Sequence, residues 1–174
     1  PISDFLRYGR EYLLPDEPVS LYRYVEHLTE MTLCRKYALR RVLEIGPGTD
    51  PFFRYISPDD VDRAGLLDYS PEVLAFCDDA LPGFRLELIR ADLTQPAEMA
   101  RVDRGWDYIV CNSILEHLPD DQRFVNDMHS MLAQGGFIAC STVLHKCLYN
   151  EWDHAVGHYR RYTQGELRAL FAQW

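Results

Sequence analysis

Glycines and polar side chains follow several apolar runs of the sequence, at the points where strands would end. Gly46 and Gly48 stand two residues apart after the first run, a spacing that lets the backbone approach a bound molecule closely. Asp68 and Asp92 end two later runs, and Asn112 ends another. One carboxylate at such a position can accept both hydroxyls of a ribose, and another can accept the amino group of an adenine. These residue types together indicate a pocket for a nucleoside.

The residues after the two glycines discriminate between nucleotide ligands. Where the dinucleotide fingerprint G-x-G-x-x-G has its third glycine, this chain has Pro51. We expect Asp50 to cap a helix that starts at Pro51, which would place a carboxylate where a pyrophosphate binds. No G-K-[ST] follows, so a phosphate-binding P-loop is excluded. The loop therefore favours a nucleoside without phosphates over NAD or FAD.

Short apolar runs alternate with helical segments along the chain. This alternation predicts an α/β fold with a doubly wound, mainly parallel sheet, buried on both faces by helices. Ligands bind such sheets at the carboxyl ends of the strands, where the polar residues above stand. The expected strands are 41–45, 63–68, 85–90, 106–111 and 136–142. The expected helices are 20–39, 51–57, 71–80, 96–101, 121–133 and one that begins near 163.

The bulk composition argues against several classes of partner. The chain has 174 residues, of which 47% are hydrophobic and 26% charged, and its net charge is -9. This acidic balance disfavours general binding to nucleic acid or to a membrane surface. No apolar run is long enough to span a bilayer, and we read no signal peptide. The five cysteines include no C-x-x-C pair, which favours a reducing, cytoplasmic location.

Five motifs follow one another between residues 41 and 142. They are VLEIGPGTD, LLDYSPEVL, IRADLTQP, WDYIVCNSILEHLPDD and MLAQGGFIACST. In type, order and spacing they resemble the motifs of class I S-adenosylmethionine-dependent methyltransferases. The later stretch WDHAVGHYRRYTQGEL is similar to a segment that follows the fifth strand in many small-molecule members. The resemblance implies a Rossmann-like fold and methyltransferase activity, with S-adenosyl-L-methionine as cofactor and S-adenosyl-L-homocysteine as product.

The resemblance assigns one group of residues to the methionine end of the cofactor. Glu44 and the backbone at Gly46 and Gly48 would hold this end, and the backbone of Asn112 would line it. The chain departs from the family's fuller E-x-G-x-G-x-G pattern at Asp50, which stands in place of the third glycine.

A second group would hold the nucleoside end of the cofactor. The resemblance implies that Asp68 takes the ribose hydroxyls, and that Tyr69 lies against the adenine. It also implies that Asp92 accepts the adenine amino group, with the backbone of Leu93 beside it.

The implied reaction is an in-line displacement in which an acceptor heteroatom attacks the sulfonium methyl group. Because the cofactor is already activated, the protein mainly aligns the reactants, and a base is optional. His117 is the nearest candidate base, since imidazole titrates near neutrality, and the alternative is a residue that packs against its loop. We expect His158 and Tyr159 to roof the substrate pocket, and residues 160–162 to anchor this loop by salt bridges and packing.

The acceptor is expected to be a small molecule rather than a nucleic acid. After the fourth strand the chain reads CNSI, without the Asn/Asp-Pro-Pro-Tyr/Phe motif of members that methylate nitrogens of bases and glutamines. Two other classes remain open. One is a non-catalytic S-adenosylmethionine-binding or nucleoside-binding module. The other, disfavoured by Asp50 and Pro51, is an NAD-dependent oxidoreductase.

The cysteines and histidines near the fifth strand and the tyrosines near the N-terminus could also have functional roles. We expect no metal site, because the cysteines and histidines near the fifth strand match no zinc spacing. This set comprises Cys140, His145, Cys147, His154 and His158. Four early tyrosines would either cover a ligand as a lid or belong to the core. These are Tyr8, Tyr12, Tyr22 and Tyr24.

The family's sheet has seven strands, and the last two have no counterpart in this sequence. We therefore expect residues 41–174 to form a methyltransferase domain that is incomplete at its C-terminal end. Residues 1–40, which precede this domain, are expected to form an aromatic, helical N-terminal cap. The chain would then be a fragment, or a homo-oligomer or partner segment would complete the sheet, because an exposed strand edge invites association.

Overall fold

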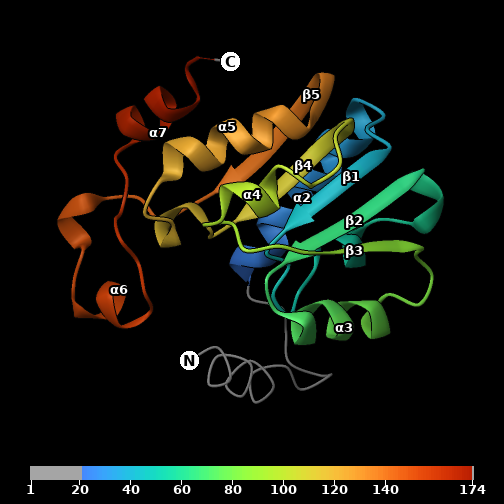
Figure 1. Cartoon of the computed structure of the whole chain (residues 1–174), viewed down its shortest axis with the longest axis horizontal. Coiled ribbons are helices and arrows are strands. Elements are labelled where there is room, and N and C mark those ends of the chain that lie inside the picture. Colours follow the sequence, from blue (N-terminus) through green and yellow to red (C-terminus); the bar gives the residue numbers. More distant parts are fainter. Residues whose placement is uncertain (1–20, 174) are drawn as a thin grey trace.

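The computed structural model describes residues 21–173, in which five strands form one sheet (Figure 1). The strands lie in the order β3-β2-β1-β4-β5, and every neighbouring pair is parallel. The order reverses between β1 and β4, which is where such sheets bind ligands. The predicted doubly wound, Rossmann-like α/β fold is confirmed. The strands are β1 (Arg41–Ile45), β2 (Arg63–Asp68), β3 (Leu86–Arg90), β4 (Trp106–Asn112) and β5 (Leu132–Ser141).

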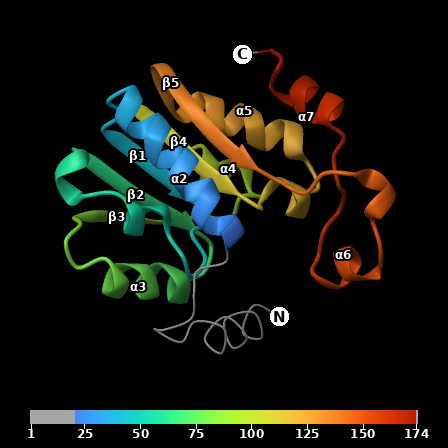
Figure 2. The same cartoon turned by 180° about the vertical axis from the view of Figure 1, so that it is seen from behind.

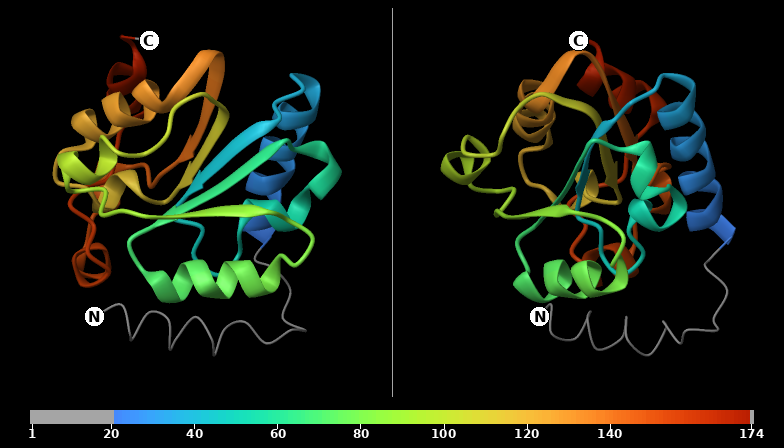
Figure 3. Two further views of the ribbon diagram at one scale, coloured as in Figure 1. Left: turned by 45° about the vertical axis from the view of Figure 1, so that its right-hand side comes forward. Right: turned by 90° about the vertical axis from the view of Figure 1, so that its right-hand side faces the viewer.

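Helices cover both faces of the sheet. Viewed along the sheet, α2 lies on one side and α4 on the other (Figure 3), and α5 lies on the side opposite α2 (Figures 1 and 2). The α-helices are α2 (Leu21–Lys36), α3 (Pro71–Ala80), α4 (Pro96–Met99), α5 (Asp121–Met131), α6 (Glu151–Ala155) and α7 (Gln164–Phe171). The 3-10 helices are η1 (Phe52–Tyr55), η2 (Pro58–Asp60), η3 (Leu115–His117) and η4 (Lys146–Leu148).

Two apolar clusters form the core, one on each face of the sheet. Successive strand residues point to opposite faces, so Val42 packs in the cluster that includes Cys34 of α2, whereas Leu43 packs in the cluster that includes Phe124 and Met128 of α5. No helix within residues 21–173 is long and apolar enough to cross a membrane. The five cysteines all lie in this range and are free thiols.

Local signals place several helix starts where the sequence predicts them. Helix α3 covers residues 71–80 as expected, because the Ser70 hydroxyl accepts the Val73 N–H and Pro71 occupies the first turn. Helix α7 begins after Thr163, whose side chain forms a capping box with Glu166. The predicted cap at Ser20 lies outside the described residues.

The outer strands correct the expectation of five strands buried on both faces. Strands β1, β2 and β4 are buried, but β3 and β5 form the edges, and Leu88 of β3 is 43% exposed. Strand β5 also begins earlier than predicted, because Leu132 already pairs with Trp106 across a bulge. The chain turns from α5 directly into this pairing, so the helix ends at Met131 rather than at residue 133.

Candidate cofactor and acceptor site

The two glycines of the first loop adopt conformations that other residues rarely take. Gly46 has φ +67° and Gly48 has φ +58°, both in the left-handed region. A Cβ atom at Gly46 would collide with the Ile114 side chain. The Gly46 N–H donates to the Leu67 carbonyl at 2.8 Å, which holds the loop against the end of β2. The loop therefore keeps its backbone close to the switch point of the sheet, the place between β1 and β4 where the strand order reverses.

The helix after this loop does not start as predicted. Instead of a helix over 51–57 capped by Asp50, the chain forms the short 3-10 helix η1 without a side-chain cap from Pro51. The Glu44 carboxylate lies at the buried end of β1. Its two oxygens, instead of Asp50, accept the Phe52 N–H at 2.9 Å. Asp50 turns away and accepts the Tyr55 hydroxyl at 3.0 Å. The predicted Asp50 cap was wrong for this reason.

Glu44, rather than Asp50, disfavours a dinucleotide at this loop. A pyrophosphate binds at the first N–H groups of the helix after β1. In this chain the Glu44 carboxyl group already accepts the Phe52 N–H at that position, so this donor is not available to a pyrophosphate.

A buried polar network that the sequence does not predict lies behind the loop. His27 and Glu30 of α2 pair at 2.9 Å, and the Asn112 side-chain amide donates to Glu30 at 2.7 Å. Glu44 is only 4% exposed, and burial, countered by the Phe52 N–H and reinforced by the nearby Glu30, raises its pKa to about 8. The network links α2 to the end of β4 through the Asn112 side chain.

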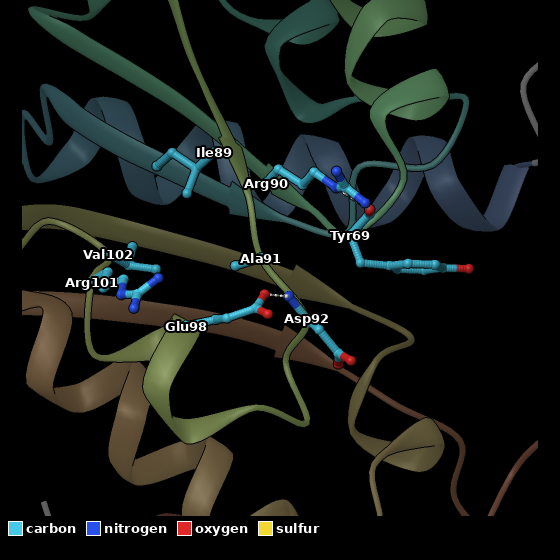
Figure 4. Close-up of a pocket in the computed structure, with 8 residues that line it drawn as sticks. All are labelled: Tyr69, Ile89, Arg90, Ala91, Asp92, Glu98, Arg101 and Val102. Carbon is cyan, nitrogen blue, oxygen red and sulfur yellow. Dashed lines mark hydrogen bonds between the residues drawn. The ribbon is translucent and has the colours of Figure 1, made fainter.

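Residues predicted for the nucleoside end stand around the ends of β2 and β3. A pocket of about 580 Å³ lies there. The Tyr69 ring and the Asp92 carboxylate lie at the same end of it (Figure 4). The Asp92 carboxylate accepts the Thr94 N–H at 2.8 Å, and Tyr69 is 45% exposed. The remaining lining residues are Ile89, Arg90, Ala91, Glu98, Arg101 and Val102. The pocket therefore offers the aromatic ring of Tyr69 and the carboxylates of Asp92 and Glu98 as hydrogen-bond acceptors.

Asp68 and Leu93 flank this pocket without lining it. The Asp68 carboxylate accepts the Ser70 N–H at 2.8 Å, and burial raises its pKa. The Leu93 carbonyl accepts a hydrogen bond from the Arg123 guanidinium. Asp68 is the last residue of β2, and Leu93 lies three residues after β3. Their roles at the nucleoside end of the cofactor stay predictions.

The predicted acceptor residues meet at the ends of β4 and β5. His117 lies in η3, and its ring centroid is 4.7 Å from that of His158 in an edge-to-face arrangement. Burial lowers the pKa of His117, as does His158, while Glu116 opposes the shift. The Tyr159 side chain is 60% exposed, and its N–H donates to the Glu116 carbonyl at 2.7 Å. Two residues predicted separately, 41 positions apart, are therefore neighbours.

The loop that carries His158 is anchored as the sequence predicts. Arg161 donates to the buried Asp153 at 2.8 Å, and Arg160 pairs with Asp121 at 2.8 Å. The Tyr162 hydroxyl is buried and donates to Asp121 at 2.8 Å. These contacts confirm that residues 160–162 hold the loop in place. All four early tyrosines, by contrast, lie outside the described residues or have side chains that the structure does not describe.

The strand order and the glycine loop after β1 are those of a Rossmann-like methyltransferase core. A family model described as a methyltransferase domain matches residues 11–174, and the chain belongs to this family. No curated protein sequence matches the chain significantly.

Solved structures share the fold at low sequence identity. The YcgJ protein from Bacillus subtilis is 18% identical with a TM-score of 0.72, over 86% of this chain and 67% of YcgJ. The N-methyltransferase NodS from Bradyrhizobium japonicum, in complex with S-adenosylhomocysteine, is 21% identical with a TM-score of 0.60, over 69% of this chain and 61% of NodS. The DhpI complex with S-adenosylhomocysteine is 22% identical with a TM-score of 0.62, over 88% of this chain and 78% of DhpI. This chain thus spans about two thirds of the length of YcgJ.

Proposed function

We propose that this domain transfers the methyl group of S-adenosylmethionine to a heteroatom of a small-molecule acceptor. The observation that carries the proposal is the position of the polar residues. The left-handed glycine loop, the acids at the ends of β2 and β3, and the His117–His158 pair all lie at the carboxyl edge of one sheet. A cofactor held across this edge would have its two ends at different strands.

The two ends of the cofactor would bind at different strands. Its methionine end would lie at Glu44, Gly46, Gly48 and the Asn112 backbone, where the positive φ angles keep the loop backbone close to the sheet. The ribose hydroxyls would donate to Asp68. The adenine would lie against Tyr69, with its amino group donating to Asp92 and the Leu93 backbone beside it.

The acceptor would bind on the other side of the switch point, under the loop that carries His158 and Tyr159. The lowered pKa of His117 keeps its imidazole neutral at physiological pH, so it can accept a proton from the acceptor. A small molecule is favoured over nucleic acid because the chain carries a net charge of -9.

The proposal is tested by following a labelled methyl group from S-adenosylmethionine. We expect label in small acceptors that carry a hydroxyl, thiol or amine, matched by release of S-adenosylhomocysteine, and none in RNA or DNA. His117→Gln should lower kcat by about 10²- to 10⁴-fold with unchanged cofactor affinity, whereas His154→Gln, at an exposed position of α6, should leave kcat unchanged.

The experiment also separates the enzyme from the alternative of a binding module. Cofactor binding with no label in any member of a broad acceptor panel would favour a module without turnover. Labelled nucleic acid would overturn the small-molecule assignment.

A further inference from the structure

We propose that Glu116, His117 and His158 form a binding site for a divalent transition-metal ion. Each side chain offers one ligand atom, and these three atoms lie within 4.8 Å of one another. Glu116 and His117 come from η3 after β4, whereas His158 comes from the loop after α6. The fold therefore brings two imidazoles and a carboxylate together from two separate segments.

The strongest sign of a missing partner is the Glu116 carboxylate. Glu116 is 1% exposed, and its Oε2 atom accepts the Thr142 hydroxyl at 2.8 Å. Its Oε1 atom is equally buried but has no hydrogen-bond partner among the described residues. A buried carboxylate oxygen without a partner is unfavourable, and a bound cation would satisfy it.

His158 is held in the way that metal-binding histidines are held. Its Nδ1 atom lies 2.8 Å from Asp153 Oδ1, so its Nε2 atom is left to face a ligand. Asp153 is fully buried and is itself fixed by Arg161 at 2.8 Å and by the Asn150 N–H at 3.0 Å. A carboxylate that orients a ligand histidine through the other ring nitrogen is the usual second layer of a metal site.

The ligand set selects the kind of ion. Two imidazoles and one carboxylate suit Zn²⁺, Co²⁺, Fe²⁺ or Mn²⁺, whereas Mg²⁺ and Ca²⁺ prefer oxygen ligands alone. Three protein ligands also leave coordination positions open for another molecule.

Binding of the ion is independent of methyl transfer, but its use rests on the proposed function. Glu116 follows β4 and accepts the hydroxyl of Thr142, the residue after β5, so the cluster lies at the edge where we place the acceptor. There the ion would bind an oxygen atom of the acceptor and favour loss of its proton. His117 would then act as a metal ligand instead of a base.

Titration of Co²⁺ and Zn²⁺ into the tag-free chain, after treatment with a chelator, tests this site. We expect one equivalent of Co²⁺ to bind with a visible absorption spectrum, and Zn²⁺ to displace it. His117→Ala, His158→Ala and Glu116→Gln should each weaken binding by at least about tenfold. His154→Ala removes an exposed histidine near the same loop and should bind as the wild type does.

The contrary results are equally definite. Absence of saturable binding near one equivalent, or affinity unchanged in both histidine variants, would overturn the proposal, provided that circular dichroism shows folded variants. S-adenosylmethionine affinity is measured on the same samples. If the cofactor binds and the metal does not, the metal site is wrong and the proposed function stands. If the metal binds and the cofactor does not, the proposed function is wrong and the metal site stands.

Discussion

Asp68→Ala should weaken S-adenosylmethionine binding by about 1.5–3 kcal/mol, or roughly 10- to 150-fold, because a charged hydrogen-bond acceptor is lost. The Asp68 carboxylate stands at the end of β2, and burial raises its pKa. Such a group is already partly desolvated, so ribose hydroxyls that donate to it replace little water. Titration calorimetry at fixed pH and salt measures the change directly.

Two further variants make the Asp68 result specific. Asp68 also accepts the Ser70 N–H at 2.8 Å, so Asp68→Ala removes a loop contact as well as a ligand contact. Asp68→Asn keeps an oxygen that can accept this N–H but loses the charge, and it should fall between the wild type and Asp68→Ala. Asp79→Ala, at an exposed position of α3, should bind normally. Wild-type affinity in Asp68→Ala would remove the ribose assignment.

The free energy of unfolding should decline as the pH rises from about 5 to about 9, and Glu44 should cause a large part of this decline. Burial raises the pKa of Glu44 from 4.5 to about 8. Between these values the folded chain holds a proton that the unfolded chain has released, so rising pH favours unfolding. The stability associated with protonated Glu44 is complete below pH 4.5 and is lost as the pH passes through 8. The linkage amounts to a few kcal/mol, on the order of 1.4 kcal/mol for each unit of pKa difference.

Urea unfolding of Glu44→Gln across this range isolates the contribution. Glutamine stays neutral, and its carbonyl oxygen can still accept the Phe52 N–H, so the variant should lose most of the decline and be more stable than the wild type at the alkaline end of the range. Glu151→Gln, at an exposed position of α6, should follow the wild-type curve. Parallel curves for wild type and Glu44→Gln would contradict the raised pKa.

The sequence predicts the parts of the fold that depend on local signals. Strands β1 and β2 have the predicted bounds, as does α3, because their apolar runs end at glycines or at the Ser70–Pro71 cap. The polar residues expected to hold the cofactor also lie at one edge of the sheet, because the carboxyl ends of parallel strands meet there.

The errors and omissions arise where residues distant in the sequence compete or cooperate. Asp50 has the right spacing for a cap, but Glu44 reaches the Phe52 N–H from inside the sheet, and no local pattern shows this. Asn112 and Glu30 are hydrogen-bonded across 82 positions. His27 and Glu30 are both buried on α2, and no local sequence pattern shows that these polar side chains face the sheet.

The same limit applies to the acceptor side of the site. His117 and His158 are each visible as candidates in the sequence, but their contact depends on the path of the loop after β5. Glu116 stands next to His117 and was overlooked, because nothing in the sequence shows that its carboxylate is buried.

The central claim is that the glycine loop and the strand-end acids hold S-adenosylmethionine. Calorimetric titration of S-adenosylmethionine and S-adenosylhomocysteine into the purified chain, with NAD as the control, tests it most directly. We expect both adenosyl compounds to bind one site with a Kd on the order of 1–100 μM, a binding free energy of about -8.2 to -5.5 kcal/mol, and NAD not to bind. A folded chain that binds neither adenosyl compound, or that binds NAD in preference, would contradict this account.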